Sequence, residues 1–203
     1  MKKLFALILS MLMVITCTEE TAYATEEDTQ EKVVLYSTTE EERDRIYEAE
    51  IEKIMSDLNK NNQARGPKYH YKSENLPSVD KIVGGLAGNQ EERGYRIEVG
   101  GSLYYSDSGG PAITGSVALS LPSPYNRVSF SINLGVRSEG IGMAINVPNG
   151  KDFFKIWIDK TVEIRPYIVY RKRSGMDGEW EIDHCGSVPV VVAISATLIK
   201  VPQ

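Results

Sequence analysis

The chain has few of the residues that carry most metal and covalent chemistry. Its 203 residues include only two cysteines, Cys17 and Cys185, and two histidines, His70 and His184. Metal sites built on thiolates or imidazoles need closely spaced pairs such as C-x-x-C or H-x-x-x-H, and the sequence shows no such spacing. We therefore expect no metal site and no bound cofactor.

Positive charge is also in short supply. Lys and Arg number 23 against 28 Asp and Glu, which gives a formal net charge of −5. Nucleic acids and anionic membranes attract basic surfaces, so an acidic chain is a poor candidate for binding either. We expect no nucleic-acid partner.

The N-terminal hydrophobic run is too short to be a transmembrane helix. It extends from Leu4 to Cys17, and a membrane-spanning helix needs ~20 residues. Two lysines precede it and Ala22-Tyr23-Ala24 follows it, an order typical of a secretory signal peptide cleaved after Ala24. Lipidation of Cys17 is the alternative, but Thr16 stands where bacterial lipoproteins usually carry Gly, Ala or Ser. We expect a secreted, extracellular protein without a stable membrane anchor and, with Cys185 alone remaining, without an internal disulfide.

Alternation of apolar and polar residues dominates the chain from 112 to 201. Successive side chains of a strand point to opposite faces, so a period of two predicts half-buried antiparallel strands. Turn residues recur at short spacing between these runs, which favours an antiparallel β-sandwich or open barrel of about seven or eight strands. The clearest apolar positions are Val117, Leu119, Leu121, Val128, Phe130, Ile132 and Leu134.

One segment near the N-terminus has a helical period instead. Apolar residues from Tyr47 to Leu58 fall on one stripe, and Thr38 with Glu41, or Thr39 with Glu42, can form a capping box ahead of them. This predicts an N-terminal amphipathic helix from about 39 to 60. The expected layout is a signal peptide (1–24), an acidic lead-in with the helix (25–66), a connector (67–94) and the β domain (95–203).

Two fragments resemble trypsin-type serine proteases. Lys81–Gly85 resembles the activation site of that family, and Asp107–Pro111 resembles the segment around its nucleophile, which would be Ser108. The family places a double barrel between these two segments, and the fragments are too close here to allow one. The segment that holds the family's catalytic base is missing as well. A secreted hydrolase using Ser108 therefore remains only an alternative.

Asp183-His184-Cys185 raises a second hydrolase alternative, with Cys185 as nucleophile. Neighbouring residues of a strand face opposite ways, so His184 is badly placed to deprotonate Cys185, and His70 would be the better partner. A lone cysteine is more often an inert, packed thiol. The absence of catalytic spacing favours a non-catalytic protein.

A local basic patch interleaved with aromatic residues is the best binding candidate. It consists of Arg165, Tyr167, Arg171, Arg173 and Trp180. Such residues can grip an anionic glycan or a carboxylate. The competing interpretation is that these charges protect edge strands from unwanted pairing.

The hairpin 113–134 has a further interpretation. Its two strands of ~10 residues have serine-lined faces, close to the 9–11 residues of a membrane-spanning strand. A pore-forming or membrane-active protein that inserts this hairpin is therefore a third alternative.

From Tyr95 onward, the layout resembles the uncharacterised small secreted proteins of Firmicutes, whose domains carry no assigned function. The signal peptide and the segment from Lys160 to Arg173 carry this resemblance. It implies a secreted protein of a Gram-positive bacterium and transfers no active residue. The sequence as a whole favours a secreted, non-catalytic binding module whose partner is an extracellular protein or glycan.

Overall fold

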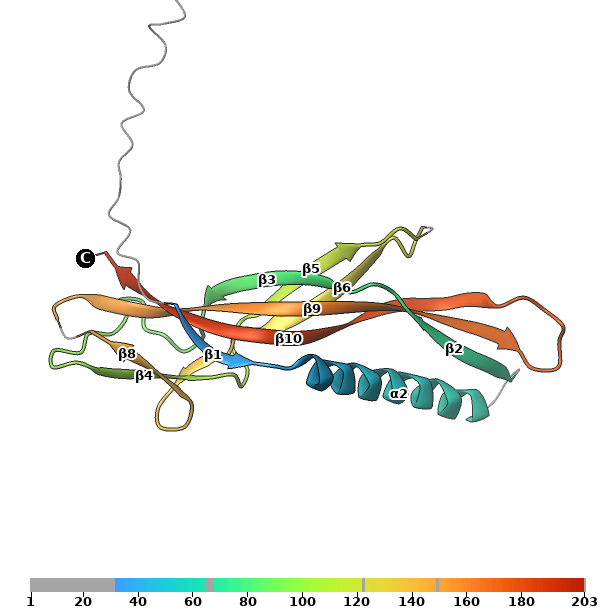
Figure 1. The fold of residues 1–203 in the computed structure, drawn as a ribbon, viewed down its shortest axis with the longest axis horizontal. Helices are drawn as coiled ribbons and strands as arrows, with labels where there is room; N and C mark the ends of the chain where they lie inside the picture. Colours follow the sequence, from blue (N-terminus) through green and yellow to red (C-terminus); the bar gives the residue numbers. More distant parts are fainter. Residues whose placement is uncertain (1–31, 65–67, 122, 149, 203) are drawn as a thin grey trace, which may run out of the picture. The chain divides into compact units, whose positions relative to one another are not determined.

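The computed structural model describes residues 32–64, 68–121, 123–148 and 150–202. The expected signal peptide, Cys17 and Ala24 lie outside the described residues. Within these ranges the chain is mainly β, with antiparallel sheets and one helix, as the sequence predicts (Figure 1). Nowhere in them does a helix combine the length and apolar character needed to traverse a bilayer.

Two long strands form the centre of the fold. β9 (Phe153–Arg173) and β10 (Glu181–Val201) each have 21 residues and pair antiparallel from Phe153↔Val201 to Arg171↔Glu181. The sequence predicts separate, shorter segments here, at 153–158, 161–171, 180–185 and 190–198. Pairing continues past those limits because the apolar alternation also continues on both sides of the polar pair Asp159-Lys160.

Three further strands complete a five-stranded sheet. β1 (Val33–Ser37) pairs with β10, while β2 (Tyr69–Asn75) and β3 (Val79–Leu86) pair in succession with the other side of β9. The prediction of a connector at 67–94 is therefore wrong, because the segment contains β2 and β3. β2 alternates tyrosine and serine with His70, Lys72 and Glu74 and so lacks the aliphatic positions that mark a strand in sequence.

The pairing of β9 with β10 continues through Pro166, which lies opposite Ser187. Leu76 donates its amide to the Pro166 carbonyl at 2.9 Å, so this residue's backbone faces the break between β2 and β3. Proline has no amide hydrogen, and it is tolerated in a sheet only where no ladder partner needs one. The sequence predicts an edge or a bulge for Pro166; the structure instead places it at a gap between two successive partner strands.

The helix α2 (Glu40–Ala64) follows β1, so it is not N-terminal as predicted. Of the two predicted capping boxes, Thr39 with Glu42 forms. Thr39 donates its amide to Glu42 Oε2 at 2.9 Å, and the Glu42 amide donates to Thr39 Oγ1 at 3.3 Å. Three glutamates, Glu40, Glu41 and Glu42, occupy the first turn, where the helix dipole favours negative charge.

The remaining strands form two small sheets. β4 (Gly101–Ser106) lies between β7 (Val136–Ser138) and β8 (Met143–Val147), and β5 (Ala112–Ala118) pairs only with β6 (Arg127–Asn133). The described residues thus contain ten strands in sheets of five, three and two. A sandwich or open barrel of seven or eight strands is not confirmed.

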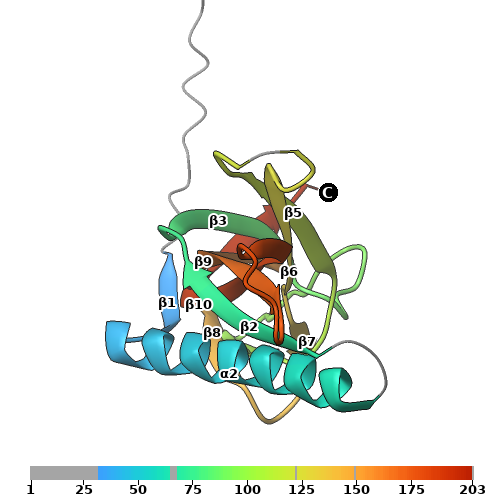
Figure 2. The same cartoon turned by 90° about the vertical axis from the view of Figure 1, so that its right-hand side faces the viewer.

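Both faces of the β9–β10 ribbon are covered by apolar packing. On one face, β4 and β8 cover the end near Ile156 and Ile158, and the β5–β6 hairpin covers Val162 and Ile164. The opposite face packs Tyr167 and Val169 against α2 (Figure 2). Alternate residues of one strand therefore belong to different cores.

A bulge in β10 changes which side chains face which core. The register shifts between Val191 and Ala193. Before it, Val188 and Val190 pack with α2; after it, Ile194 and its alternate neighbours pack with β4 and β8. An extra residue on one strand reverses the parity of its side chains, which explains the exchange. The hydroxyl of Thr38 donates to the Val191 carbonyl at 2.9 Å and so satisfies the exposed backbone at the bulge.

Among the described residues, no strand pairs with most of the N-terminal half of β10 on the side away from β9. β1 pairs only with residues 193–196. Thr38 bonds the Val191 carbonyl from this side, so the backbone N–H and C=O groups of Val191 point away from β9. Alternate residues of a strand point these groups the same way, so the backbone of Pro189 also faces the open edge. The open edge therefore lacks one amide donor.

Thr39→Ala removes the N-cap of α2 and is expected to reduce the free energy of unfolding by about 1 kcal/mol. Urea denaturation followed by circular dichroism measures the loss. Glu52→Ala, an exposed change in the middle of the same helix, is the matched control and is expected to shift stability by less than ~0.5 kcal/mol. Equal losses in the two variants would contradict the capping role.

Candidate functional site

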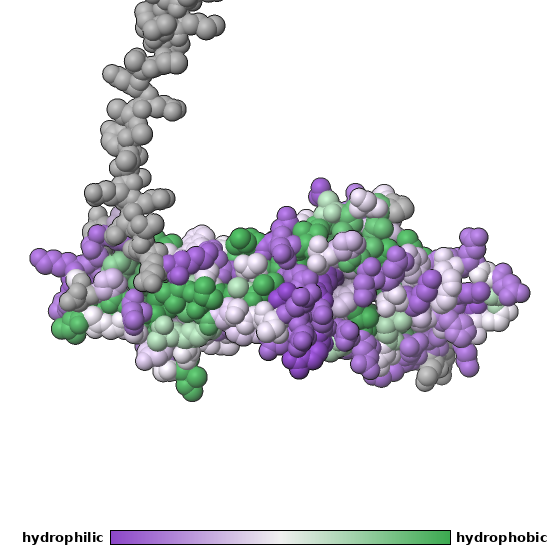
Figure 3. Space-filling model, in the orientation of Figure 1, coloured by the Kyte–Doolittle hydropathy of each residue, from purple (hydrophilic) through white to green (hydrophobic). Residues whose placement is uncertain are grey.

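A pocket of about 370 Å³ lies at the end of the ribbon where β9 turns into β10. Hydrophilic residues cover much of this end of the surface (Figure 3). Three of the five predicted binding residues, Arg171, Arg173 and Trp180, line the pocket. Its full lining is Tyr69, Arg171, Lys172, Arg173, Met176, Gly178, Glu179, Trp180 and Glu181.

Trp180 contributes an indole ring to the lining of this pocket. The residue is 38% exposed, an unusual exposure for so large an apolar side chain. Lys72 Nζ on β2 lies 4.9 Å from the centre of the Trp180 ring and 5.0 Å from that of Tyr170. These cation–π contacts hold the indole against the ribbon while leaving part of it in solvent.

The three consecutive cations of the pocket have different surroundings. Arg171 Nη1 lies 3.1 Å from Asp183, its Nε lies 3.8 Å from Glu181, and its guanidinium stacks over Tyr69 at 5.4 Å. Lys172 and Arg173 have no ion pair with any residue that the structure describes. Arg171 is thus a fixed wall of the pocket, and the next two cations are available to an anion.

Arg165 and Tyr167 do not belong to this site. Tyr167 is 7% exposed and packs beneath α2, where Gly186 opposite it leaves room because a Cβ there would overlap the phenol. Arg165 bonds Asp44 of α2 at 2.6 Å. These two residues attach the helix to the sheet.

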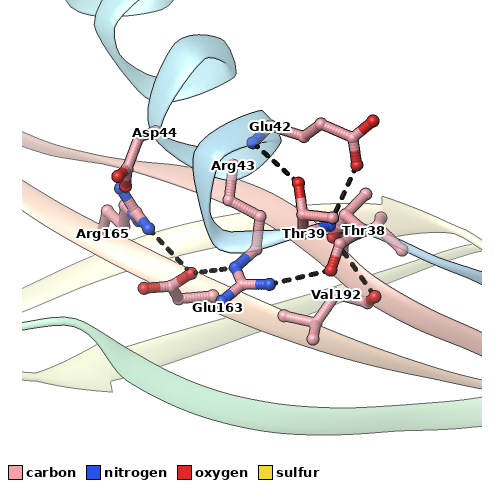
Figure 4. Close-up of polar contacts among 9 residues, drawn as sticks. Thr38, Thr39, Glu42, Arg43, Asp44, Glu163, Arg165 and Val192 are labelled. Carbon is pink, nitrogen blue, oxygen red and sulfur yellow. Dashed lines mark hydrogen bonds and ion pairs between the residues drawn. The ribbon is translucent and has the colours of Figure 1, made fainter.

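Arg165 is part of a network of charges under the first turns of α2 (Figure 4). Glu163 accepts from Arg43 at 2.8 Å and from Arg165 at 3.0 Å, and Arg43 also donates to the Thr38 carbonyl at 3.0 Å. Burial acts to raise the pKa of Glu163. Hydrogen bonds from Arg165, Ser78 and Arg43 outweigh that effect, and the pKa of Glu163 is lowered.

No histidine lies near Ser108. Ser108 follows β4, and its hydroxyl lies 2.8 Å from that of Ser106. The neighbouring Asp107 contacts Lys160 of β9, whereas His184 pairs with Val169 and His70 with Lys172. At ~3.3 Å per residue, the nearer histidine is roughly 30 Å along the ribbon from that contact. The structure does not assemble a Ser-His pair.

Cys185 and the histidines are also separated. Cys185 packs beneath the β5–β6 hairpin, while His184 contacts Asp183 at 2.9 Å and lies edge-on to Tyr167, whose side chain faces α2. His70 is on β2, four positions further along β9 and on its other side, which places it well over 10 Å away. Burial raises the pKa of the Cys185 thiol and so disfavours the reactive thiolate.

Sequence reasoning missed a buried charge at the centre of the ribbon. Lys160 is 3% exposed and pairs with Asp107, which also accepts a hydrogen bond from Tyr105 at 2.9 Å. Burial, and then the Asp107 charge, raise the pKa of Tyr105 and keep it a neutral donor. The available signal was Lys160 itself, a charge in line with the inward-facing Ile158 and Val162. Among the described residues, no group of three potential ligands that could hold a metal ion occurs.

Alkylation measures the state of Cys185. We expect iodoacetamide at pH 8 to modify Cys185 of the native protein roughly tenfold or more slowly than in urea, because burial raises its pKa and limits access. Peptide mapping by mass spectrometry gives both rates. Faster labelling in the native protein would indicate an activated nucleophile.

Glu163 links stability to pH. Its pKa is lower in the folded chain, so its contribution is complete above the unfolded-state value of ~4.3 and disappears as the pH falls through the folded value. Glu163→Gln is expected to be less stable at neutral pH and to lose less stability on acidification below ~4.3. Urea midpoints between pH 3 and 7 test this; parallel curves for the two proteins would refute it.

No family model, curated protein or solved structure matches the chain.

Proposed function

We propose that this protein is an extracellular, non-catalytic binding module whose ligand site is the pocket at the end of the β9–β10 ribbon. The observation that carries the proposal is that one pocket is lined by the partly exposed Trp180 and by two cations, Lys172 and Arg173, that lack ion-pair partners among the described residues. Secretion, which the N-terminal sequence predicts, gives such a site access to partners outside the cell.

The chemistry of the pocket favours an acidic sugar. Aromatic side chains offer flat apolar surface at little cost in side-chain entropy, so Trp180 suits the face of a sugar ring. Arg173 and Lys172 supply charge for a carboxylate on that ring. Glu179 and Glu181 line the same pocket, and their negative charges disfavour binding of a polyanion such as nucleic acid.

The position of the site supports recognition without catalysis. The described lining residues include no nucleophile placed beside a base, and Cys185 and Ser108 lie elsewhere. Arg171 is paired with Tyr71 of β2 on one side and with Glu181 of β10 on the other, so the pocket walls are held in position before a ligand arrives. A pre-organised site loses less entropy on binding.

Titration with oligogalacturonate, with uncharged oligogalactose as its neutral counterpart, tests the proposal. We expect the protein to bind the acidic oligosaccharide and not the neutral one, with affinity falling as salt is added. Trp180→Ala is expected to weaken binding by about tenfold or more, and Arg173→Ala by several-fold, because each removes a principal contact. Isothermal titration calorimetry measures these affinities.

Matched variants distinguish this site from general surface effects. Tyr104 has the same 38% exposure as Trp180 but lies on β4, and Arg93 is an exposed arginine outside the pocket. Tyr104→Ala and Arg93→Ala are expected to bind like the wild type. Equal binding of the acidic and neutral sugars, or equal losses in control and pocket variants, would exclude the proposed site.

A further inference from the structure

The β5–β6 hairpin has one apolar face and one hydroxyl face. Its apolar face points into the protein and packs on Val162 and Ile164 of β9, both of which are fully buried. Its outer face carries two cross-strand pairs of hydroxyl side chains, Thr114–Ser131 and Ser116–Ser129. The inner positions are Ile113, Gly115, Val117, Val128, Phe130 and Ile132.

This hairpin is attached to the rest of the fold chiefly by apolar contact. It forms a two-stranded sheet of its own. Among the described residues, its hydrogen bonding to the five-stranded sheet consists of one contact, from the Ser187 hydroxyl to the Ser129 carbonyl at 3.0 Å. Its own backbone bonds are internal, so they persist if the hairpin moves as a unit.

Glycines mark both ends of the hairpin. Gly109 and Gly110 precede it with φ of 76° and 86°, and Gly135 follows it with φ of 80°. The Gly135 amide donates to the Gly109 carbonyl at 2.8 Å, and a Cβ on Gly110 would overlap the Gly135 carbonyl. Just before this pair, Asp107 is fixed to the buried Lys160. Glycines, which adopt many backbone conformations, thus lie next to Asp107, which is held in place by Lys160. A hinge has this arrangement.

We propose that the β5–β6 hairpin swings out on these glycines and inserts into a lipid bilayer. Its apolar face then contacts the acyl chains instead of β9, and its hydroxyl face lines a water-filled path. The bonds from Leu134 to Pro111 and from Leu119 to Asn126 extend the paired residues to 111–119 and 126–134. This length meets the ~9–11 residues that a membrane-spanning strand needs.

Insertion requires several copies of the chain. A lone hairpin has two unpaired edges, and unpaired backbone groups are too costly in hydrocarbon, so hairpins of neighbouring copies must pair side by side. The net charge of −5 gives no attraction to anionic headgroups, and an uncharged lipid surface is therefore the target. This inference uses none of the residues of the sugar site, so either proposal can fail alone.

Dye release from phosphatidylcholine vesicles is the first test, using the purified protein with Cys185 reduced. We expect release of trapped carboxyfluorescein and discrete conductance steps in planar bilayers of the same lipid. Intact vesicles together with a silent bilayer overturn the proposal. Trp180→Ala is expected to release dye as the wild type does.

Ion selectivity identifies the lining of the path. Ser116→Lys combined with Ser131→Lys puts charge on the exposed hydroxyl face and is expected to shift the reversal potential toward anion selectivity. Ala144→Lys adds the same type of charge to an exposed position of β8 and is expected to leave selectivity unchanged. Circular dichroism confirms that each variant is folded. A conducting double-lysine variant with wild-type selectivity would show that this face does not line the path.

Discussion

Antiparallel pairing of β9 with β10 is the constraint on which the other elements depend. The two strands bond along nearly their whole length, and every other described element packs on them directly or through a neighbour. Their side chains supply three separate apolar cores, because one strand offers alternate residues to opposite faces. The bulge at Val192 lets β10 serve a different core on each side of it. A strand pair without such a bulge would send the apolar residues of one half into solvent.

Among the described residues, the one fully buried charged side chain lies where this ribbon passes between two cores. Lys160 lies between the apolar groups packed by β4 and β8 and those packed by β5 and β6. Its ion pair with Asp107 offsets the free-energy cost of removing the ammonium group from water. The same contact fixes the loop from which the β5–β6 hairpin starts. Glu163, Arg43 and Arg165 make a comparable connection on the opposite face, between the sheet and α2.

The sequence pattern predicts local structure well and spatial arrangement poorly. Alternation identified the β5–β6 hairpin, and the capping residues located the start of α2, because both signals depend on residues close in the chain. β2 was missed because Tyr69 and Tyr71 alternate with charges in place of aliphatic residues. Pairings between distant segments leave no such local trace. The sequence therefore predicts a single basic site. In the structure, Arg165 and Tyr167 face α2, whereas Arg171, Arg173 and Trp180 line the pocket.

The unpaired edge of β10 has a consequence for how the protein behaves at high concentration. Exposed strands recruit further strands, and repeated recruitment is the route to cross-β fibres. Pro189 removes a donor from this edge, and irregular register near Asp183 and Val192 prevents a long flat stretch on either side of it. The open side of the ribbon therefore offers another copy of the chain no long, regular row of backbone donors and acceptors.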